Sequence, residues 1–121
     1  MKEDELKSRT KEFSLRIIKL IQALPKNMVS DVLGKQLLRS ATSVSANYRA
    51  ACRARSRAEF SAKMSIVIEE ADEYLFWLEL IGDADLMDKY RLQDLLKEAD
   101  ELISIFVVSL ATSKKKWTTY F

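Results

Sequence analysis

Residues 56–82 carry the clearest structural signal of this chain and read SRAEFSAKMSIVIEEADEYLFWLELIG. Apolar side chains recur there at spacings of three and four, which predicts a long helix with one buried face. Ser56 and Glu59 fit a capping box, in which each side chain accepts a hydrogen bond from the backbone of the other. At the other end, Gly82 is expected to cap the helix in the left-handed conformation. The expected buried face consists of Phe60, Met64, Val67, Ala71, Tyr74, Leu78 and Ile81.

Three more helices are expected around this one, at residues 4–24, 30–53 and 88–113. Pro25 ends the first of them, because proline disfavours the helical conformation in the residue before it. Residues 114–121 follow the last helix as a basic and aromatic tail. The second helix carries a stripe of mostly small residues, which lets a neighbouring helix approach closely. The stripe comprises Gly34, Leu37, Ala41, Val44, Tyr48 and Ala51.

The composition fits a single helical domain over residues 1–121. Only two glycines and one proline occur in 121 residues, so the chain has little turn chemistry and favours long helices. Short connections make neighbouring helices antiparallel, which predicts an all-α, up-down-up-down four-helix bundle. No apolar run approaches the roughly 18 residues that a membrane span needs, and the charged start lacks the apolar core of a signal peptide. The sequence therefore predicts a cytoplasmic protein that does not bind membranes.

The chain contains no histidine and a single cysteine, Cys52. The lack of histidine removes the commonest general base, the commonest transition-metal ligand and any Ser-His or Cys-His pair. Cys52 is expected to be a small buried or half-buried helix residue. Carboxylates of the third helix could bind a divalent metal, but a salt-bridging or solvated face is the simpler interpretation, because the sequence offers no pocket or nucleophile. We therefore expect no enzymatic activity, metal, cofactor or small-molecule substrate.

The charges are divided between two blocks, which the formal net charge of +2 conceals. Residues 35–63 hold seven basic side chains and one acid, whereas residues 69–101 hold twelve acids and three basic side chains. A basic block is typical of a site for polyanions. Four of its cations share one face of the second helix, two extend this face across the following turn, and one begins the next helix. These candidate nucleic-acid-binding residues are Lys35, Arg39, Arg49, Arg53, Arg55, Arg57 and Lys63.

Two functions of the basic block remain open at this point. One is electrostatic binding of RNA or DNA through release of counterions, which implies no sequence code. The other is pairing with the acidic block across a helix–helix or subunit interface. In that case the chain would be a protein–protein interaction scaffold or an accessory subunit, for example of a reverse transcriptase. The candidate pairing acids are Glu69, Glu70, Asp72 and Glu73.

The chain has more apolar residues than one buried stripe per helix can use. Several lie off the main stripes of the third and fourth helices, and contiguous exposed apolar patches usually mark interfaces. Trp77 is expected to pack in the core or in such an interface rather than to stack on bases. Self-association into a homo-oligomer is therefore expected. The surplus residues are Ile66, Ile68, Leu75, Phe76, Trp77, Leu80, Ile105, Val107 and Val108.

Four stretches of the chain resemble one known family. They are residues 36–47 (QLLRSATSVSAN), 56–60 (SRAEF), 69–73 (EEADE) and 77–80 (WLEL). They are similar to bacterial four-helix-bundle proteins encoded in intervening sequences of 23S ribosomal RNA, which are often labelled S23 ribosomal protein. The resemblance extends from residues 24–26 into the fourth helix.

This resemblance implies a four-helix bundle that assembles as a ring-like homopentamer and has no known enzymatic activity. Accessory proteins of diversity-generating retroelements look similar, and these are basic pentamers that bind nucleic acid and a reverse transcriptase. Ser45 departs from the family pattern, because many members have proline there, and residues 48–50 (YRA) are more basic than the same segment of many relatives. The basic positions that match are Arg39, Arg49, Arg53, Arg55 and Arg57.

Overall fold

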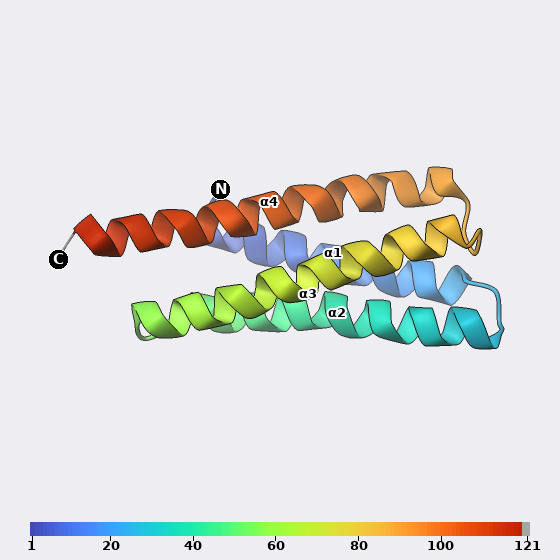
Figure 1. Ribbon diagram of the computed structural model, residues 1–121, viewed down its shortest axis with the longest axis horizontal. Helices are drawn as coiled ribbons and strands as arrows, with labels where there is room; N and C mark the ends of the chain where they lie inside the picture. Colours follow the sequence, from blue (N-terminus) through green and yellow to red (C-terminus); the bar gives the residue numbers. More distant parts are fainter. Residues whose placement is uncertain (120–121) are drawn as a thin grey trace.

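The computed structural model describes residues 1–119, with side chains through Lys114. The helices are α1 (Glu3–Ala23), α2 (Met28–Cys52), α3 (Arg57–Asp83) and α4 (Lys89–Thr119). They are linked by short turns and lie alongside one another (Figure 1). The described residues contain no strand, so the predicted all-α fold is confirmed.

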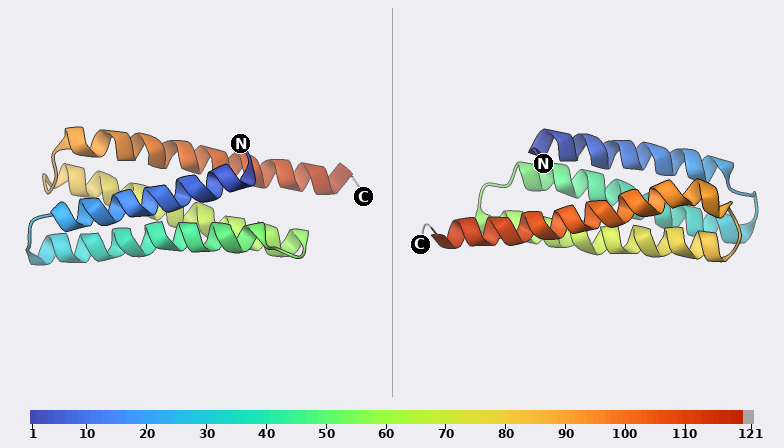
Figure 2. Two further views of the ribbon diagram at one scale, coloured as in Figure 1. Left: turned by 180° about the vertical axis from the view of Figure 1, so that it is seen from behind. Right: turned by 90° about the horizontal axis from the view of Figure 1, so that it is seen from above.

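Each helix packs against the next one in the sequence, and α1 also touches α4, which closes the bundle. Contact between α2 and α3 is the most extensive, whereas contact between α1 and α4 is the thinnest and includes ion pairs from Arg9 to Glu98 and Glu101. Consecutive helices run in opposite directions, and the C-terminal end of α4 projects beyond the other three helices (Figure 2). This is the predicted up-down-up-down four-helix bundle.

The core is formed by the stripes expected from the sequence. On α3, six of the seven predicted positions are buried and Phe60 is half-buried. The small-residue stripe of α2 is buried along its whole length. Aromatic rings join the helices, with Phe13 packing 4.7 Å from Tyr74 and Phe106 lying 5.9 Å from Tyr48, measured between ring centroids. Burial of these apolar faces is the main driving force for the fold.

The helix starts follow the local sequence signals in part. Ser56 caps α3 as predicted, because its hydroxyl accepts a hydrogen bond from the amide of Glu59 at 3.1 Å. The Glu59 carboxylate, however, accepts from the amide of Arg55 at 3.4 Å, so the reciprocal half of the capping box is not formed with Ser56. α2 begins slightly earlier than expected, since the side chain of Asn27 accepts from the amide of Ser30 at 2.8 Å and caps the first turn.

The C-terminal end of α3 differs from the prediction. Gly82 lies inside the helix without a positive φ, and the left-handed residue is Asp85, with φ of 56°. The amide of Asp85 donates to the carbonyl of Gly82 at 3.1 Å. The amide of Leu86 donates to that of Ile81 at 3.1 Å, which completes a Schellman motif. Gly82 serves packing instead, because a Cβ there would lie 3.0 Å from Leu92 Cδ1 on α4.

α4 is longer than expected, because it continues as far as Thr119 through most of the stretch predicted as a tail. The rest of that stretch, and the side chains of residues 115–121, lie outside the described part of the structure. At its start, the carboxylate of Asp88 accepts from the amide of Tyr90 at 2.9 Å. Even so, no helix among the described residues is both long and apolar enough to cross a membrane.

Candidate nucleic-acid interface

Arg39 lies on the outer surface of α2 and is held by two acids of α3. Its guanidinium donates to Glu70 and to Glu73, and the N···O distance to each carboxylate is 3.1 Å. The hydrogen bond to Glu70, together with the charge of that carboxylate, raises the pKa of Arg39. An exposed ion pair of this kind adds little stability. The pairing does, however, compensate the charge of one of the arginines that the sequence places on the basic face.

The other two candidate pairing acids have no such role. Glu69 and Asp72 are exposed on α3, and neither forms an ion pair within residues 1–114. Trp77 is half-buried, and its ring meets that of Phe76 edge-on at a centroid distance of 5.0 Å. Its indole N–H is buried without an acceptor among the described residues. Trp77 thus belongs to a partly exposed apolar surface of α3.

Arg49 and Arg53 line a groove between α1 and α2, which has a volume of about 530 Å³ and is called the α1–α2 groove below. Lys7 and Lys11 line the same groove from α1. Lys7 is partly neutralised, because acids of the preceding turn lie 3.6 and 3.8 Å from its Nζ. Lys11, Arg49 and Arg53 form no ion pair with any residue that the structure describes. The groove therefore presents three uncompensated cations from two helices.

Hydroxyl groups lie between these cations in the α1–α2 groove. Ser45 Oγ on α2 lies 2.9 Å from the carbonyl oxygen of Thr10, and Ser14 Oγ on α1 lies 3.1 Å from that of Ala41. The two serine oxygens are 2.7 Å apart, so one of the two hydroxyls donates to the other, which in turn donates to its carbonyl. Thr42 donates to a carbonyl one turn earlier in α2, at 2.7 Å. The serine bonds tie α1 to α2, and together with the Thr42 bond they direct these hydroxyl protons to protein oxygens rather than to a ligand.

The remaining predicted cations do not line the α1–α2 groove. Lys35 lines a separate pocket of about 560 Å³ beside the turn between α1 and α2. Arg55 is exposed in the turn after α2, and Arg57 is exposed at the first residue of α3. Lys63 is half-buried one to two turns further along α3. The predicted basic residues are therefore divided among two pockets, the turn after α2, the first turns of α3 and an ion-pair cluster.

The sequence prediction omits Lys7 and Lys11, which form the second wall of the α1–α2 groove. Their spacing of four residues places them on one side of α1. Arg49 and Arg53 show the same spacing on α2. That recurring spacing was a usable signal, but it becomes informative only once α1 and α2 are known to be antiparallel neighbours.

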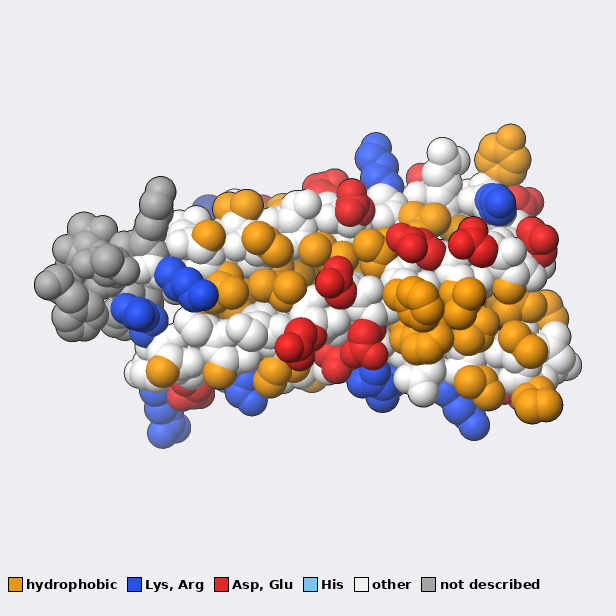
Figure 3. Space-filling view, in the orientation of Figure 1, with side chains coloured by type: hydrophobic (Ala, Val, Ile, Leu, Met, Phe, Trp, Pro, Cys, Tyr) orange, Lys and Arg blue, Asp and Glu red, His pale blue; other side chains and the backbone are white. Residues whose placement is uncertain are grey.

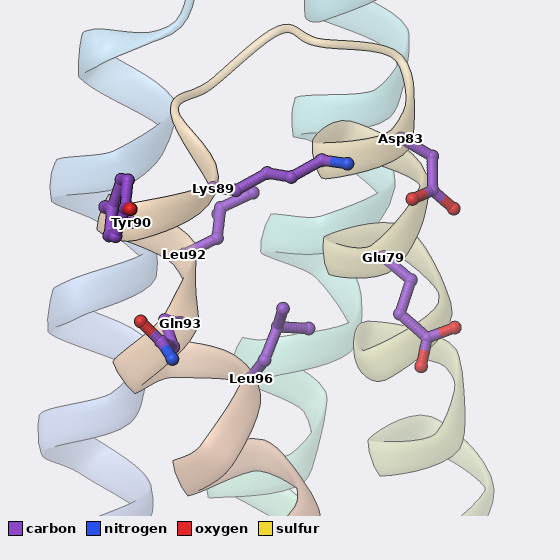
Figure 4. A pocket seen from close by; sticks show the side chains of 8 residues that line it. Glu79, Asp83, Lys89, Tyr90, Leu92, Gln93 and Leu96 are labelled. Carbon is purple, nitrogen blue, oxygen red and sulfur yellow. The ribbon is translucent and has the colours of Figure 1, made fainter.

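A further group of charged side chains surrounds a pocket of about 550 Å³ where α3 turns into α4. Glu79 and Asp83 project from α3, and Lys89 extends from the start of α4 toward Asp83 (Figure 4). The described residues contain no group of three or more His, Cys, Asp or Glu that could hold a metal ion. Burial raises the pKa of the Cys52 thiol, which keeps the thiol protonated at neutral pH.

The family described as 23S rRNA-intervening sequence protein matches residues 2–107 of the chain. A crystal structure of a protein of unknown function from the S23 ribosomal protein family of Bacteroides thetaiotaomicron, determined at 1.70 Å resolution, is also similar. The two structures share a TM-score of 0.84 and 32% sequence identity, over 92% of this chain and 99% of that one. A comparison with curated proteins gives no match. The family resemblance seen in the sequence is confirmed, and this chain belongs to the 23S rRNA-intervening sequence protein family.

Proposed function

We propose that this protein is a non-enzymatic binding protein that holds RNA or DNA in the α1–α2 groove. The observation that carries the proposal is that Lys11, Arg49 and Arg53 line one groove from two helices without an acidic partner in the described structure. A phosphate backbone is the ligand that such a surface favours, because each neutralised phosphate releases condensed counterions. The Arg39 cluster adds less, since its charge is already compensated by Glu70 and Glu73.

Binding of this kind is expected to be electrostatic and to lack a base code. Four of the five hydroxyl groups that line the groove donate within the protein, so few oriented donors remain to read base edges. Three uncompensated cations per chain predict a slope of roughly −2 to −3 when the logarithm of the association constant is plotted against the logarithm of salt concentration.

The proposal predicts that reversing the groove charges abolishes binding while the same change of charge elsewhere does not. The variant Arg49→Glu/Arg53→Glu is expected to bind fluorescent RNA at least tenfold more weakly than the unmodified protein, as measured by anisotropy at low salt, because two phosphate contacts become repulsive. The matched control is Arg91→Glu/Lys97→Glu, which changes two exposed cations of α4. Equal losses for the two variants, or no binding by the unmodified protein, would contradict the proposal.

We also propose, as a second candidate function, that copies of the chain assemble with one another through the face of α3 and α4. Phe76 on α3 is 53% exposed and Val108 on α4 is 61% exposed. Apolar side chains gather in groups across this face, with acids between them (Figure 3). Patches of this kind usually mark an interface. Among residues 1–114, the large exposed apolar residues of α3 and α4 are Ile66, Phe76, Tyr90, Val107 and Val108.

Self-assembly has a direct test by light scattering. The ring-like pentamer that the family resemblance implies would give a mass about five times the 13.9 kDa of one chain. The variant Phe76→Glu/Val108→Glu is expected to shift this mass to that of a monomer, because it places charges in an apolar contact. The control Leu15→Glu adds a charge at an exposed apolar residue of α1 and is expected to keep the assembly. A monomeric unmodified protein would contradict self-assembly and would leave a different protein as the partner of this face.

A further inference from the structure

We propose that the ligand of the α1–α2 groove is a single strand of nucleic acid, held by its phosphates, rather than a duplex. This inference rests on the proposed function and narrows its ligand class. Three features carry it: the size of the groove, the position of cations on both of its walls, and the chemistry of the side chains between them.

The size of the groove favours a strand over a double helix. Its volume of about 530 Å³ lies within the roughly 300–1,000 Å³ range of sites for small ligands. That space accommodates a short piece of sugar–phosphate backbone between the two helices. A duplex is wider than the gap between two packed helices, so it would rest on the rims and leave the interior of the groove empty.

The cations are placed to contact successive phosphates of one strand. Arg49 and Arg53 lie one turn apart on α2, which is about 6 Å along the helix axis at 1.5 Å per residue. Lys7 and Lys11 repeat this spacing on the opposite wall. Neighbouring phosphates of a single strand are separated by a similar distance. A strand lying along the groove would therefore meet Lys11, Arg49 and Arg53 in succession, whereas Lys7 is already partly neutralised.

The side chains between the cations give the bases nothing to bind. None of the described residues that line the groove is aromatic, so the stacking platform used by many single-strand-binding proteins is missing here. The hydroxyls of Ser14, Ser45 and Thr42 donate to backbone carbonyls or, for one of the two serines, to the other serine. The phosphates are thus expected to face into the groove and the bases to face solvent, which makes the site indifferent to base identity.

The test compares one RNA in two states. A labelled strand of about 12 nucleotides is titrated with the full-length protein at about 50 mM salt, first alone and then annealed to its complement. The single strand is expected to bind at least tenfold more tightly than the duplex. The dissociation constants of homopolymers of uridine, adenosine and cytidine are expected to agree within about threefold, since base stacking and contacts to base edges contribute little to binding. Arg49→Gln/Arg53→Gln is expected to remove this preference by weakening single-strand binding selectively.

The outcomes separate this inference from the proposed function. If neither RNA binds, both fail. If the duplex binds as tightly as the strand, and the double glutamine variant weakens both equally, the groove still binds nucleic acid but the single-strand inference is wrong. A preference for one homopolymer well beyond threefold would overturn recognition through phosphates alone.

Discussion

At the scale of single residues, what lies opposite an arginine decides whether it can bind a ligand. Arg39 and Arg49 both belong to α2, and ten residues separate them. Arg39 meets two acids of α3, whereas Arg49 faces the α1–α2 groove, whose other charged lining residues are lysines and another arginine. Pairing compensates the first charge and leaves the second available. The proposed binding of nucleic acid therefore depends on Arg49 and Arg53 more than on Arg39.

Tyr74 carries a buried hydroxyl that is expected to lower the stability of the fold. Its side chain is fully buried, and its hydroxyl has no hydrogen-bond partner among the described residues. We predict that Tyr74→Phe raises the free energy of unfolding by on the order of 1 kcal/mol, because an unsatisfied buried hydroxyl carries a desolvation cost. Chemical denaturation followed by circular dichroism measures this change. A loss of stability on this substitution would show that the hydroxyl is bonded in solution.

Tyr48 provides the matched control and a dependence on pH. Its hydroxyl interacts with the Cys52 thiol and is not among the buried polar atoms that lack a partner in the described structure, so Tyr48→Phe is expected to give no comparable gain. Burial, and for Tyr74 also the charge of Glu98, raises the pKa of both phenols. The unfolded chain therefore loses these protons first as pH rises, so native stability is expected to decline above the ordinary tyrosine pKa of about 10. Tyr74→Phe is expected to make that decline shallower.

At the scale of helices, apolar spacing predicted the elements well because each stripe is set by local sequence. The ends of the helices were less predictable. Gly82 is the residue type expected at a C-cap, yet the left-handed residue is Asp85. The reason is that the capping hydrogen bonds depend on how the chain turns toward α4. The sequence predicted an end of α4 at residue 113, but the helix continues to Thr119. The lysines that follow residue 113 can either cap a helix end or continue the helix, because lysine is a good helix former.

The two glycines of the chain both lie inside helices, but they differ in what surrounds them. Replacing each with alanine therefore tests whether helix propensity or packing determines stability at that position. A Cβ at Gly34 would meet Ile21 at 3.4 Å, an ordinary contact, so Gly34→Ala is expected to stabilise the protein by roughly 0.5–1 kcal/mol through helix propensity. A Cβ at Gly82 would lie 3.0 Å from the buried Leu92. Gly82→Ala is therefore expected to destabilise the protein by about 1 kcal/mol through overpacking.

Thermal and denaturant unfolding of the two alanine variants gives the comparison directly. A gain in stability at both positions would show that α3 and α4 can separate slightly at no cost, which would contradict a packing role for Gly82.

The sequence predicted the wall of the candidate site that α2 provides but not the wall that α1 provides, and the reason lies in how the helices pack. Periodicity placed the α2 arginines on one face, but a groove needs a second helix. Lys7 and Lys11 are more than 30 residues away in the chain and reach Arg49 and Arg53 only through the antiparallel packing of α1 on α2. The sequence predicted the group of acids from which the partners of Arg39 come. Which two of them pair with Arg39, namely Glu70 and Glu73, depends on which side of α3 faces α2.

At the scale of the whole molecule, the two proposed surfaces lie on different sides of the bundle. The groove is built from α1 and α2, whereas the exposed apolar face belongs to α3 and α4. Assembly through the second surface would leave the first one open. A ring of copies would then present several weak electrostatic sites to one nucleic-acid chain, and such multivalency raises the overall affinity without any new contact.

The uncompensated cations of the α1–α2 groove, and not the paired Arg39, are proposed to bind nucleic acid. The most direct measurement is the salt dependence of RNA binding by Arg49→Gln and Arg39→Gln, followed by anisotropy between about 50 and 200 mM salt. Arg49→Gln is expected to reduce the magnitude of the slope by about 0.7–0.9, because one phosphate contact is lost. Arg39→Gln is expected to leave the slope unchanged, since its charge is already paired with Glu70 and Glu73. Equal effects of the two substitutions, or a larger effect of Arg39→Gln, would contradict the claim.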